Sequence, residues 1–262
     1  MIAYPNINPI AVDLGFASIH WYGVSYVAGI LAAWILLKYR ARHFKLSLDN
    51  DQISDLVFFA MLGIIIGGRL GSVIFYNFTY YLVHPEEIFY IHKGGMSFHG
   101  GLIGVIFSVW FFSYKNNTSF FKITDFITPV VPIGLGCGRI GNFINGELWG
   151  SPSDLPWAMI FPDPAAGGIA RHPSQLYEAF FEGLVLFIIL WWFSTISRPV
   201  RATTGLFLIF YGIFRFLVEF VRMPDQHIGY IAFNWLTMGQ LLTAPMIILG
   251  IILLVMAYRV EK

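Results

Sequence analysis

Long apolar runs separated by short polar segments dominate this chain. A helix that spans a bilayer needs about 20 mostly apolar residues, and seven segments of the chain meet this requirement. They are residues 19–37, 52–75, 97–114, 121–138, 177–195, 203–221 and 237–258. The pattern therefore predicts an all-α integral membrane protein with seven transmembrane helices, organised as one polytopic membrane domain over residues 1–262.

Two of these segments carry a further structural signal. The fourth contains Pro129 and Pro132, which remove backbone donors and are expected to kink the helix. The second contains Gly63, Gly67 and Gly71. Glycines at a four-residue spacing lie on one helical face, so this face is expected to pack closely against a neighbouring helix.

The composition agrees with a membrane protein. Hydrophobic residues make up 57% of the chain and charged residues 12%, whereas a soluble domain carries about 25% charged residues. The single cysteine, Cys137, excludes an intramolecular disulfide. Residues 1–18 lack a basic region followed by an apolar run, so we expect no cleavable signal peptide. A net charge of +1 gives no indication of a nucleic-acid partner.

The basic residues orient the array. Ten lie on the side that follows the odd-numbered spans, and four lie on the other side. The ten are Lys38, Arg40, Arg42, Lys45, Lys115, Lys122, Arg198, Arg201, Arg259 and Lys262, and the four are Lys93, Arg139, Arg171 and Arg222. By the positive-inside rule, this bias predicts an N-terminus outside and a C-terminus in the cytoplasm. With this orientation, two longer segments lie outside. They are an arm segment on the outer leaflet (76–96) and a small extracytoplasmic cap (139–176).

Polar residues gather near the outer ends of the predicted spans. Five segments of the chain contribute polar residues at one depth in the membrane. A proton or ion pathway would instead place polar groups through the whole thickness of the bilayer. The residues are Tyr22, Arg69, His99, Arg139, Asn142, Glu147, Arg215, Glu219 and Arg222. Ionisable residues in or near the membrane indicate a functional site by default.

The richest stretch runs from Gly138 to Gly150 and sets Arg139, Asn142 and Glu147 among four glycines. Glycines allow backbone amides to approach an anion closely. Arginine stays charged, and its planar fork matches phosphate oxygens. The sequence has no zinc-protease motif, no nucleophile elbow and no Walker loop. It therefore predicts an anion site without metal or cofactor.

Each of these residues also has a structural interpretation. Arg222 can place its charge at the interface, Arg215 and Glu219 can form an ion pair, and His99 can bond a helix end. Tyr22 can belong to an interfacial aromatic belt. Cys137 can be a small buried apolar residue. Arg171-His172-Pro173 can form a turn before the fifth span, with Ser174 as its N-cap.

Five motifs, in order along nearly the whole chain, resemble those of the prolipoprotein diacylglyceryl transferase family. The signature is the stretch from Gly138 to Gly150. The others are His20-Trp21-Tyr22-Gly23, Phe98-His99-Gly100-Gly101-Leu102-Ile103-Gly104, Arg171-His172-Pro173-Ser174-Gln175-Leu176-Tyr177-Glu178, and residues 211–222 with Tyr211, Arg215, Glu219 and Arg222. Within these five motifs, the sequence does not depart from the family pattern at the functional positions.

The resemblance implies a multi-pass enzyme of the bacterial cytoplasmic (inner) membrane, with its site toward the periplasmic, outer leaflet. It implies transfer of the diacylglyceryl group of phosphatidylglycerol to the lipobox cysteine of a preprolipoprotein signal peptide. A thioether forms and glycerol 1-phosphate is released, in the first step of lipoprotein maturation. Phosphatidylglycerol would enter sideways from membrane lipid, through a gap between helices near Arg69 or His99.

Roles follow as hypotheses. His99 is the candidate base for the substrate thiol, because an ordinary histidine pKa of about 6.5 suits proton removal; a strong field from the arginines would make a base unnecessary. Arg139 and Arg215 are the candidates that stabilise the leaving phosphate. Asn142 and Gly150 are expected to shape the pocket, and Tyr22 to close it or bond the phosphate. The remaining expectations are that Glu147 and Glu219 orient the guanidiniums or contact head-group hydroxyls, and that Arg69 and Arg222 contact the lipid.

Three rival functions fit part of the pattern. A transporter for an anionic metabolite would also place arginines in the membrane, but the sequence has no inverted repeat. A binding or scaffold protein has no need for this concentration of arginine, glycine and histidine. A phospholipid-using transferase that attacks phosphorus instead of carbon is the nearest enzymatic rival, and product analysis separates the two.

Overall fold

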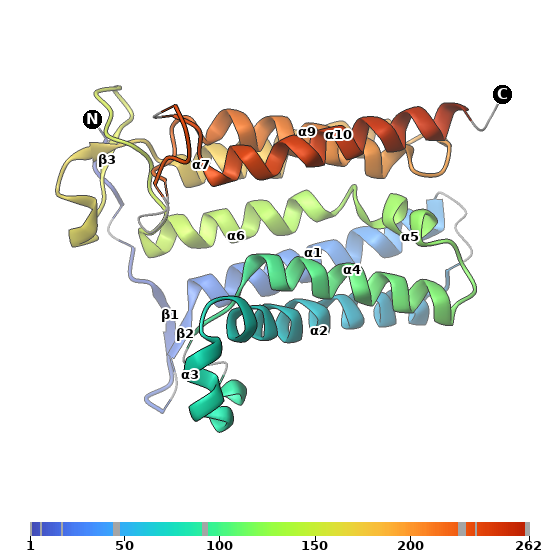
Figure 1. Ribbon diagram of the computed structural model, residues 1–262, viewed down its shortest axis with the longest axis horizontal. Coiled ribbons are helices and arrows are strands. Elements are labelled where there is room, and N and C mark those ends of the chain that lie inside the picture. Colours follow the sequence, from blue (N-terminus) through green and yellow to red (C-terminus); the bar gives the residue numbers. More distant parts are fainter. Residues whose placement is uncertain are drawn as a thin grey trace. The chain divides into compact units, whose positions relative to one another are not determined.

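The structure is a computed structural model that describes residues 2–5, 7–16, 18–43, 48–90, 94–224, 229–233 and 235–259 (Figure 1). The chain forms two compact units. One comprises Met1–Leu37 with Asp125–Lys262, and the other comprises Lys38–Thr124.

The described chain is mostly helical. Its α-helices are α1 (Trp21–His43), α2 (Asn50–Phe75), α3 (Phe78–Val83), α4 (Phe98–Lys115), α5 (Phe120–Ile127), α6 (Val131–Asn145), α7 (Ser174–Glu178), α8 (Leu186–Phe193), α9 (Ala202–Val218) and α10 (Met238–Arg259). Short 3-10 helices cover Pro85–Phe89 and Pro164–Ala166, and a π-helix covers Ala179–Val185. Two antiparallel pairs of short strands, β1 (Ile10–Asp13) with β2 (Ser18–His20) and β3 (Met159–Ile160) with β4 (Ala170–Arg171), are additions that the apolar pattern did not predict.

Helix length and hydropathy support several membrane spans. Among the described residues, four helices are long and apolar enough to cross a bilayer: α1, α2, the continuous helix Ser174–Phe193, and α10. The pair α5 and α6 adds a fifth if it counts as one span. Helices α4 and α9 occupy the other two predicted positions, but α9 is shorter than a typical span. The protein is therefore a multi-pass membrane protein, and the number seven stays a prediction.

The predicted break at the prolines is confirmed. Helix α5 ends at Ile127, α6 begins at Val131, and the two are bent by 51°. Pro132 lies in the first turn of α6, where a missing N–H costs no helical hydrogen bond. The break therefore divides the predicted span into two helices.

Helix α6 extends beyond the predicted boundary at residue 138. It continues to Asn145 and ends at Gly146, whose positive φ of 70° caps the helix. Arg139 and Asn142 consequently lie on the last turns of a helix, not in the cap segment. A Cβ added to Gly141 would lie 3.2 Å from the Tyr22 ring, so this glycine brings α1 against α6. Gly138 and Gly141 therefore lie within a helix, and the predicted end of the fourth span at residue 138 was seven residues too early.

The predicted glycine face of α2 is confirmed within the unit Lys38–Thr124. A Cβ on Gly63 would lie 2.5 Å from the carbonyl oxygen of Gly104, and one on Gly71 would lie 2.7 Å from Gly100 Cα. Gly67 faces Gly100 in the same way. Helices α2 and α4 thus touch through their backbones, as small residues permit in membrane proteins.

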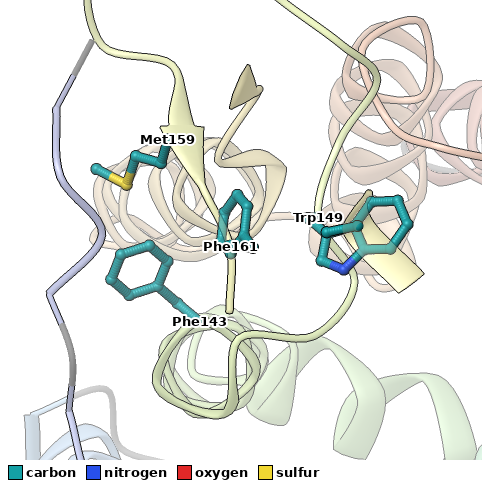
Figure 2. Close-up of a cluster of buried hydrophobic side chains, with 5 residues drawn as sticks. Phe143, Trp149, Met159 and Phe161 are labelled. Carbon is teal, nitrogen blue, oxygen red and sulfur yellow. The ribbon is translucent and has the colours of Figure 1, made fainter. Parts of the chain in front are cut away.

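The segment after α6 has a small apolar core of its own. Figure 2 shows Phe143, Trp149, Met159 and Phe161 gathered between the strands and the end of α6. The Tyr4 ring packs on Phe143 and Phe161, with centroids 5.3 and 5.2 Å apart, and its hydroxyl donates to the Phe143 carbonyl at 2.5 Å. The N-terminal residues therefore fasten this segment to the end of α6.

Candidate active site

Two arginines from different helices converge on one carboxylate. Arg139 lies on α6 and Arg215 lies near the end of α9. Glu178, at the end of α7, places its Oε2 atom 2.6 Å from Arg139 Nε and 2.9 Å from Arg215 Nη1. Glu178 is 1% exposed, whereas the side chains of Arg139 and Arg215 are 20% and 12% exposed. The carboxylate therefore lies on the buried side of the arginine pair.

Two more carboxylates surround the pair. Glu182, on the π-helix, lies 3.9 Å from Arg139 Nη2 and 3.7 Å from Arg215 Nη1. Glu219 pairs with Arg215 Nη2 at 2.9 Å and accepts a hydrogen bond from the Thr237 hydroxyl at 3.0 Å. The i,i+4 contact that the spacing of Arg215 and Glu219 predicted is thus present. The ends of α6, α7 and α9 meet at this cluster.

Arg139 keeps most of its donor capacity. Only its Nε atom lies within 3 Å of a carboxylate, and no hydrogen bond from its η nitrogens occurs in the part of the chain that the structure describes. A guanidinium has five N–H donors in a planar fork. The partly exposed fork of Arg139 can therefore bind an added anion in a bidentate manner.

Sequence reasoning missed Glu178 and Glu182 as site residues. Both lie near the start of the predicted span 177–195, and Glu178 was named only as the last residue of a family motif. A signal for them was present, because two acidic residues four positions apart in a predicted span are costly in a membrane unless they are paired. Their shared partners, Arg139 and Arg215, are the two arginines predicted to act on the leaving group.

Tyr22, Asn142 and Glu147 form a second polar group in the same unit. Glu147 Oε1 accepts hydrogen bonds from Asn142 Nδ2 at 2.8 Å and from Asn145 Nδ2 at 3.3 Å. The Tyr22 hydroxyl lies 3.1 Å from that of Tyr26 and also beside Asn142 and Glu147. Glu147 thus orients side-chain amides, and the expectation that it orients a guanidinium was wrong.

Gly150 lies where two chain segments touch. Its N–H donates to the His172 carbonyl at 2.8 Å, and it forms an antiparallel bridge with Arg222. A Cβ at this position would lie 2.5 Å from the Val221 carbonyl oxygen and 2.7 Å from His172 Cβ. Glycine is therefore required here. It allows the backbone after α9, at Val221 and Arg222, to contact the cap segment.

Arg171 and Ser174 have structural contacts of their own. Arg171 is buried, donates to the carbonyls of Ala166 and Gly150 at 2.7 and 3.2 Å, and stacks on Trp149 at 4.2 Å. Ser174 begins α7, but its hydroxyl donates to the Leu148 carbonyl at 2.9 Å. The interpretation of Ser174 as an N-cap was therefore wrong. Burial lowers the pKa of His172, which lies between them.

Arg69, in the unit Lys38–Thr124, is bound to main-chain carbonyls. The buried guanidinium donates to Glu87 at 2.5 Å, Gly94 at 2.6 Å, Ile88 at 2.7 Å and Gly95 at 3.2 Å, with Tyr90 at 3.5 Å. Its Cζ lies 5.2 Å from the Tyr81 ring centroid. These acceptors all belong to the predicted arm segment, so Arg69 holds the arm against α2.

Replacing Arg69 by alanine is therefore expected to loosen the arm. The loss of a buried donor from several carbonyls costs about 2 kcal/mol or more. Chymotrypsin should then cleave near Phe89 and Tyr90 faster than in the wild type. The exposed Arg42→Ala variant is the matched control. Equal cleavage rates in wild type and Arg69→Ala would show that Arg69 does not hold the arm.

His99 lies in the first turn of α4, where Ser97 is the N-cap and accepts from the Gly100 N–H at 3.2 Å. Its ring is exposed and meets Phe98 edge-on, with centroids 5.7 Å apart. His99 and Arg69 belong to the unit Lys38–Thr124, and the arginine cluster belongs to the other unit. The role of His99 as a base stays a prediction.

Comparison with known proteins adds an independent finding. Residues 9–256 match the family described as prolipoprotein diacylglyceryl transferase. Curated proteins named phosphatidylglycerol–prolipoprotein diacylglyceryl transferase are similar over nearly the whole chain. One from Methylococcus capsulatus is 58% identical, covering 98% of each chain. Those from Pseudomonas fluorescens and Pseudomonas aeruginosa are 55% and 54% identical, and each alignment covers 99% of this chain and 97% of the relative.

Proposed function

We infer that this chain, which belongs to the prolipoprotein diacylglyceryl transferase family, transfers the diacylglyceryl group of phosphatidylglycerol to a cysteine thiol of a prolipoprotein. The reaction forms a thioether, releases glycerol 1-phosphate and begins lipoprotein maturation. The relatives that carry this enzyme name are 54–58% identical over nearly the full length. We propose that the acceptor thiol is the lipobox cysteine of the signal peptide.

The observation that carries the site assignment is the arginine pair. Arg139 and Arg215 are held at a fixed separation by Glu178 Oε2, and the η nitrogens of Arg139 remain for a ligand. Phosphatidylglycerol is an anionic phosphodiester, and arginine matches phosphate oxygens geometrically. We therefore assign the lipid phosphate to this pair.

The proposed chemistry is a displacement at the glycerol carbon that bears the phosphate. The substrate sulfur attacks this carbon as its thiolate, the C–O bond breaks, and its electron pair stays on the phosphate oxygen. Arg139 and Arg215 stabilise the charge that develops there. The thiol proton passes to a base, for which His99 is the candidate, because an ordinary thiol pKa of about 8.5 leaves little thiolate at neutral pH.

The neighbouring groups have positioning roles in this proposal. Glu219 orients Arg215, and Glu147 holds the Asn142 amide beside Tyr22, where both can contact the lipid head group. Gly150 fixes the backbone that carries Arg222 next to the cap. Arg69 acts through the arm and not on the phosphate, since its donors are directed to carbonyls.

We propose that the chain crosses a bacterial inner membrane seven times. The N-terminus then lies outside and the C-terminus lies in the cytoplasm. The ten-to-four distribution of basic residues supports this orientation. The ends of α6, α7 and α9 that meet at the arginines then lie toward the outer leaflet. Lipid can reach such a site sideways, and glycerol phosphate can leave into the outer water.

The test uses purified protein in phosphatidylglycerol vesicles with a synthetic lipobox peptide that has one cysteine. Peptide mass and released glycerol phosphate are measured together. A gain of one diacylglyceryl group on sulfur, with an equal amount of glycerol 1-phosphate, supports displacement at carbon. A peptide that gains the phosphate indicates attack on phosphorus and contradicts the proposal, as does an unmodified peptide with folded enzyme.

A further inference from the structure

The charged side chains of the site do not balance when all are ionised. Arg139 and Arg215 contribute two positive charges, and Glu178, Glu182 and Glu219 contribute three negative charges. The phosphodiester of a bound lipid would add a fourth negative charge at the same place. Like charges repel strongly where water is excluded. A third ionised carboxylate would therefore oppose the binding of the substrate.

Glu182 is the most weakly paired of the three carboxyl groups. Glu178 lies at 2.6 and 2.9 Å from its two arginines, and Glu219 lies at 2.9 Å from one arginine and 3.0 Å from the Thr237 hydroxyl. The nearest cations to Glu182 are 3.7 and 3.9 Å away. Its side chain is 0% exposed, and neither of its oxygens has a hydrogen bond within the described residues. An ion buried without donors is costly.

A third oxygen without a hydrogen bond lies on the preceding turn. Glu178 Oε1 is also buried without a hydrogen bond among the described residues, and both carboxyl groups lie beside the same two guanidiniums, those of Arg139 and Arg215. The π-helix Ala179–Val185 starts directly after Glu178 and carries Glu182. A carboxylic acid donates one hydrogen bond, whereas a carboxylate only accepts. One proton between these groups would supply the missing donor.

Among the described residues, the other titratable groups near Glu182 are less suited to hold a proton. The groups that face Glu182 are Arg139 from α6, Glu178 from α7, and Tyr211, Arg215 and Glu219 from α9 and its end. Both arginines stay charged, and Glu219 is engaged by Arg215 and Thr237. Glu182 is therefore the group on which a proton is held best.

We propose that Glu182 carries a proton, shared with Glu178, so that the site receives the lipid phosphate as a neutral cluster of two arginines and two carboxylates. Glu182 is a positioning residue in this account, and it acts through Glu178. The part that concerns the lipid rests on the proposed transferase function, and the protonation state does not.

Glu182→Gln keeps the shape and the neutral charge, so the folded variant should still turn over phosphatidylglycerol at pH 7, whereas Glu178→Gln should not. Raising the pH removes the proton from the wild type and adds a repelling charge, so KM should rise by about tenfold or more across this transition. The Glu182→Gln variant should not show this rise. Glu178→Gln should lose activity at every pH, because it weakens the bond to both guanidiniums.

Infrared spectroscopy of the full-length protein in vesicles tests the protonation state without any turnover. The carbonyl stretch of a protonated carboxylic acid, which shifts in D2O, should be present in the wild type at pH 7 and absent in Glu182→Gln. Asp125→Asn is the control: Asp125 accepts three bonds of 2.6–2.8 Å from Arg201 and Thr204 and should not contribute to the band.

An unchanged band in Glu182→Gln would overturn the proposal, and so would a folded Glu182→Gln enzyme without activity. Retained activity with the band lost and KM independent of pH would support it. An inactive wild type would contradict the transferase function instead, while the infrared result would still decide whether Glu182 holds the proton.

Discussion

Replacing Arg139 by alanine is expected to lower kcat for diacylglyceryl transfer at least about 100-fold. Arg139 is the more exposed member of the arginine pair, and its η nitrogens are the donors available to an incoming phosphate. These donors stabilise the charge that builds on the leaving oxygen, so their loss raises the barrier of the chemical step. Turnover in lipid vesicles, measured by peptide mass, gives the result directly.

Alanine at this position also removes a partner of Glu178, so folding has to be measured beside activity. Arg139→Lys keeps the positive charge but lacks the planar fork, and it should retain the thermal stability better than the alanine variant. We expect its kcat to remain well below that of the wild type. Arg259→Ala, an exposed arginine at the end of α10, is the matched control. Wild-type rates in Arg139→Lys would show that the fork is not used.

Replacing Gly104 by valine is expected to prevent stable folding of the unit Lys38–Thr124. A Cβ at this position would meet the Gly63 carbonyl group, with its carbon 2.8 Å away, and the Gly67 Cα at 3.1 Å. All of these atoms are backbone, so no side chain can move to make space. Helices α2 and α4 would have to separate, and we expect a loss of more than about 3 kcal/mol of stability.

Gly101 offers a control in the same helix. A Cβ on Gly101 would lie 3.5 Å from the Ile64 carbonyl oxygen, which is an ordinary contact. Gly101→Ala should therefore keep a midpoint of thermal unfolding close to the wild type, whereas Gly104→Ala should lower it clearly and Gly104→Val should lower it further. Equal midpoints for the variants at the two positions would contradict the backbone contact between α2 and α4.

The features that could be predicted from the sequence are those with a local cause. Pro129 breaks a helix wherever the helix lies, and Gly63, Gly67 and Gly71 share a face by spacing alone. The pairing of Arg215 with Glu219 also follows from an i,i+4 spacing. Arg139 and Arg215 are candidate site residues because charge is costly in a membrane, and their catalytic role stays a prediction.

The features that were missed depend on contacts between distant segments. Glu178 joins Arg139 and Arg215, which lie 39 residues before it and 37 residues after it. The π-helix that carries Glu182 has no periodic signal in the sequence. The contact of Gly141 with Tyr22 was not predicted, because nothing local shows that this ring packs on it. The acceptors of Arg69 lie on the 3-10 helix Pro85–Phe89, on Tyr90, and on Gly94 and Gly95, which have positive φ, and periodicity does not predict these positions.

The most direct test of the central claim is an experimental structure of the protein with phosphatidylglycerol bound. We expect phosphate oxygens within about 3 Å of guanidinium nitrogens of both Arg139 and Arg215, with Glu178 still behind the pair. The same structure would give the distance from His99 to the reacting carbon. A phosphate held elsewhere, with neither Arg139 nor Arg215 in contact, would contradict the account.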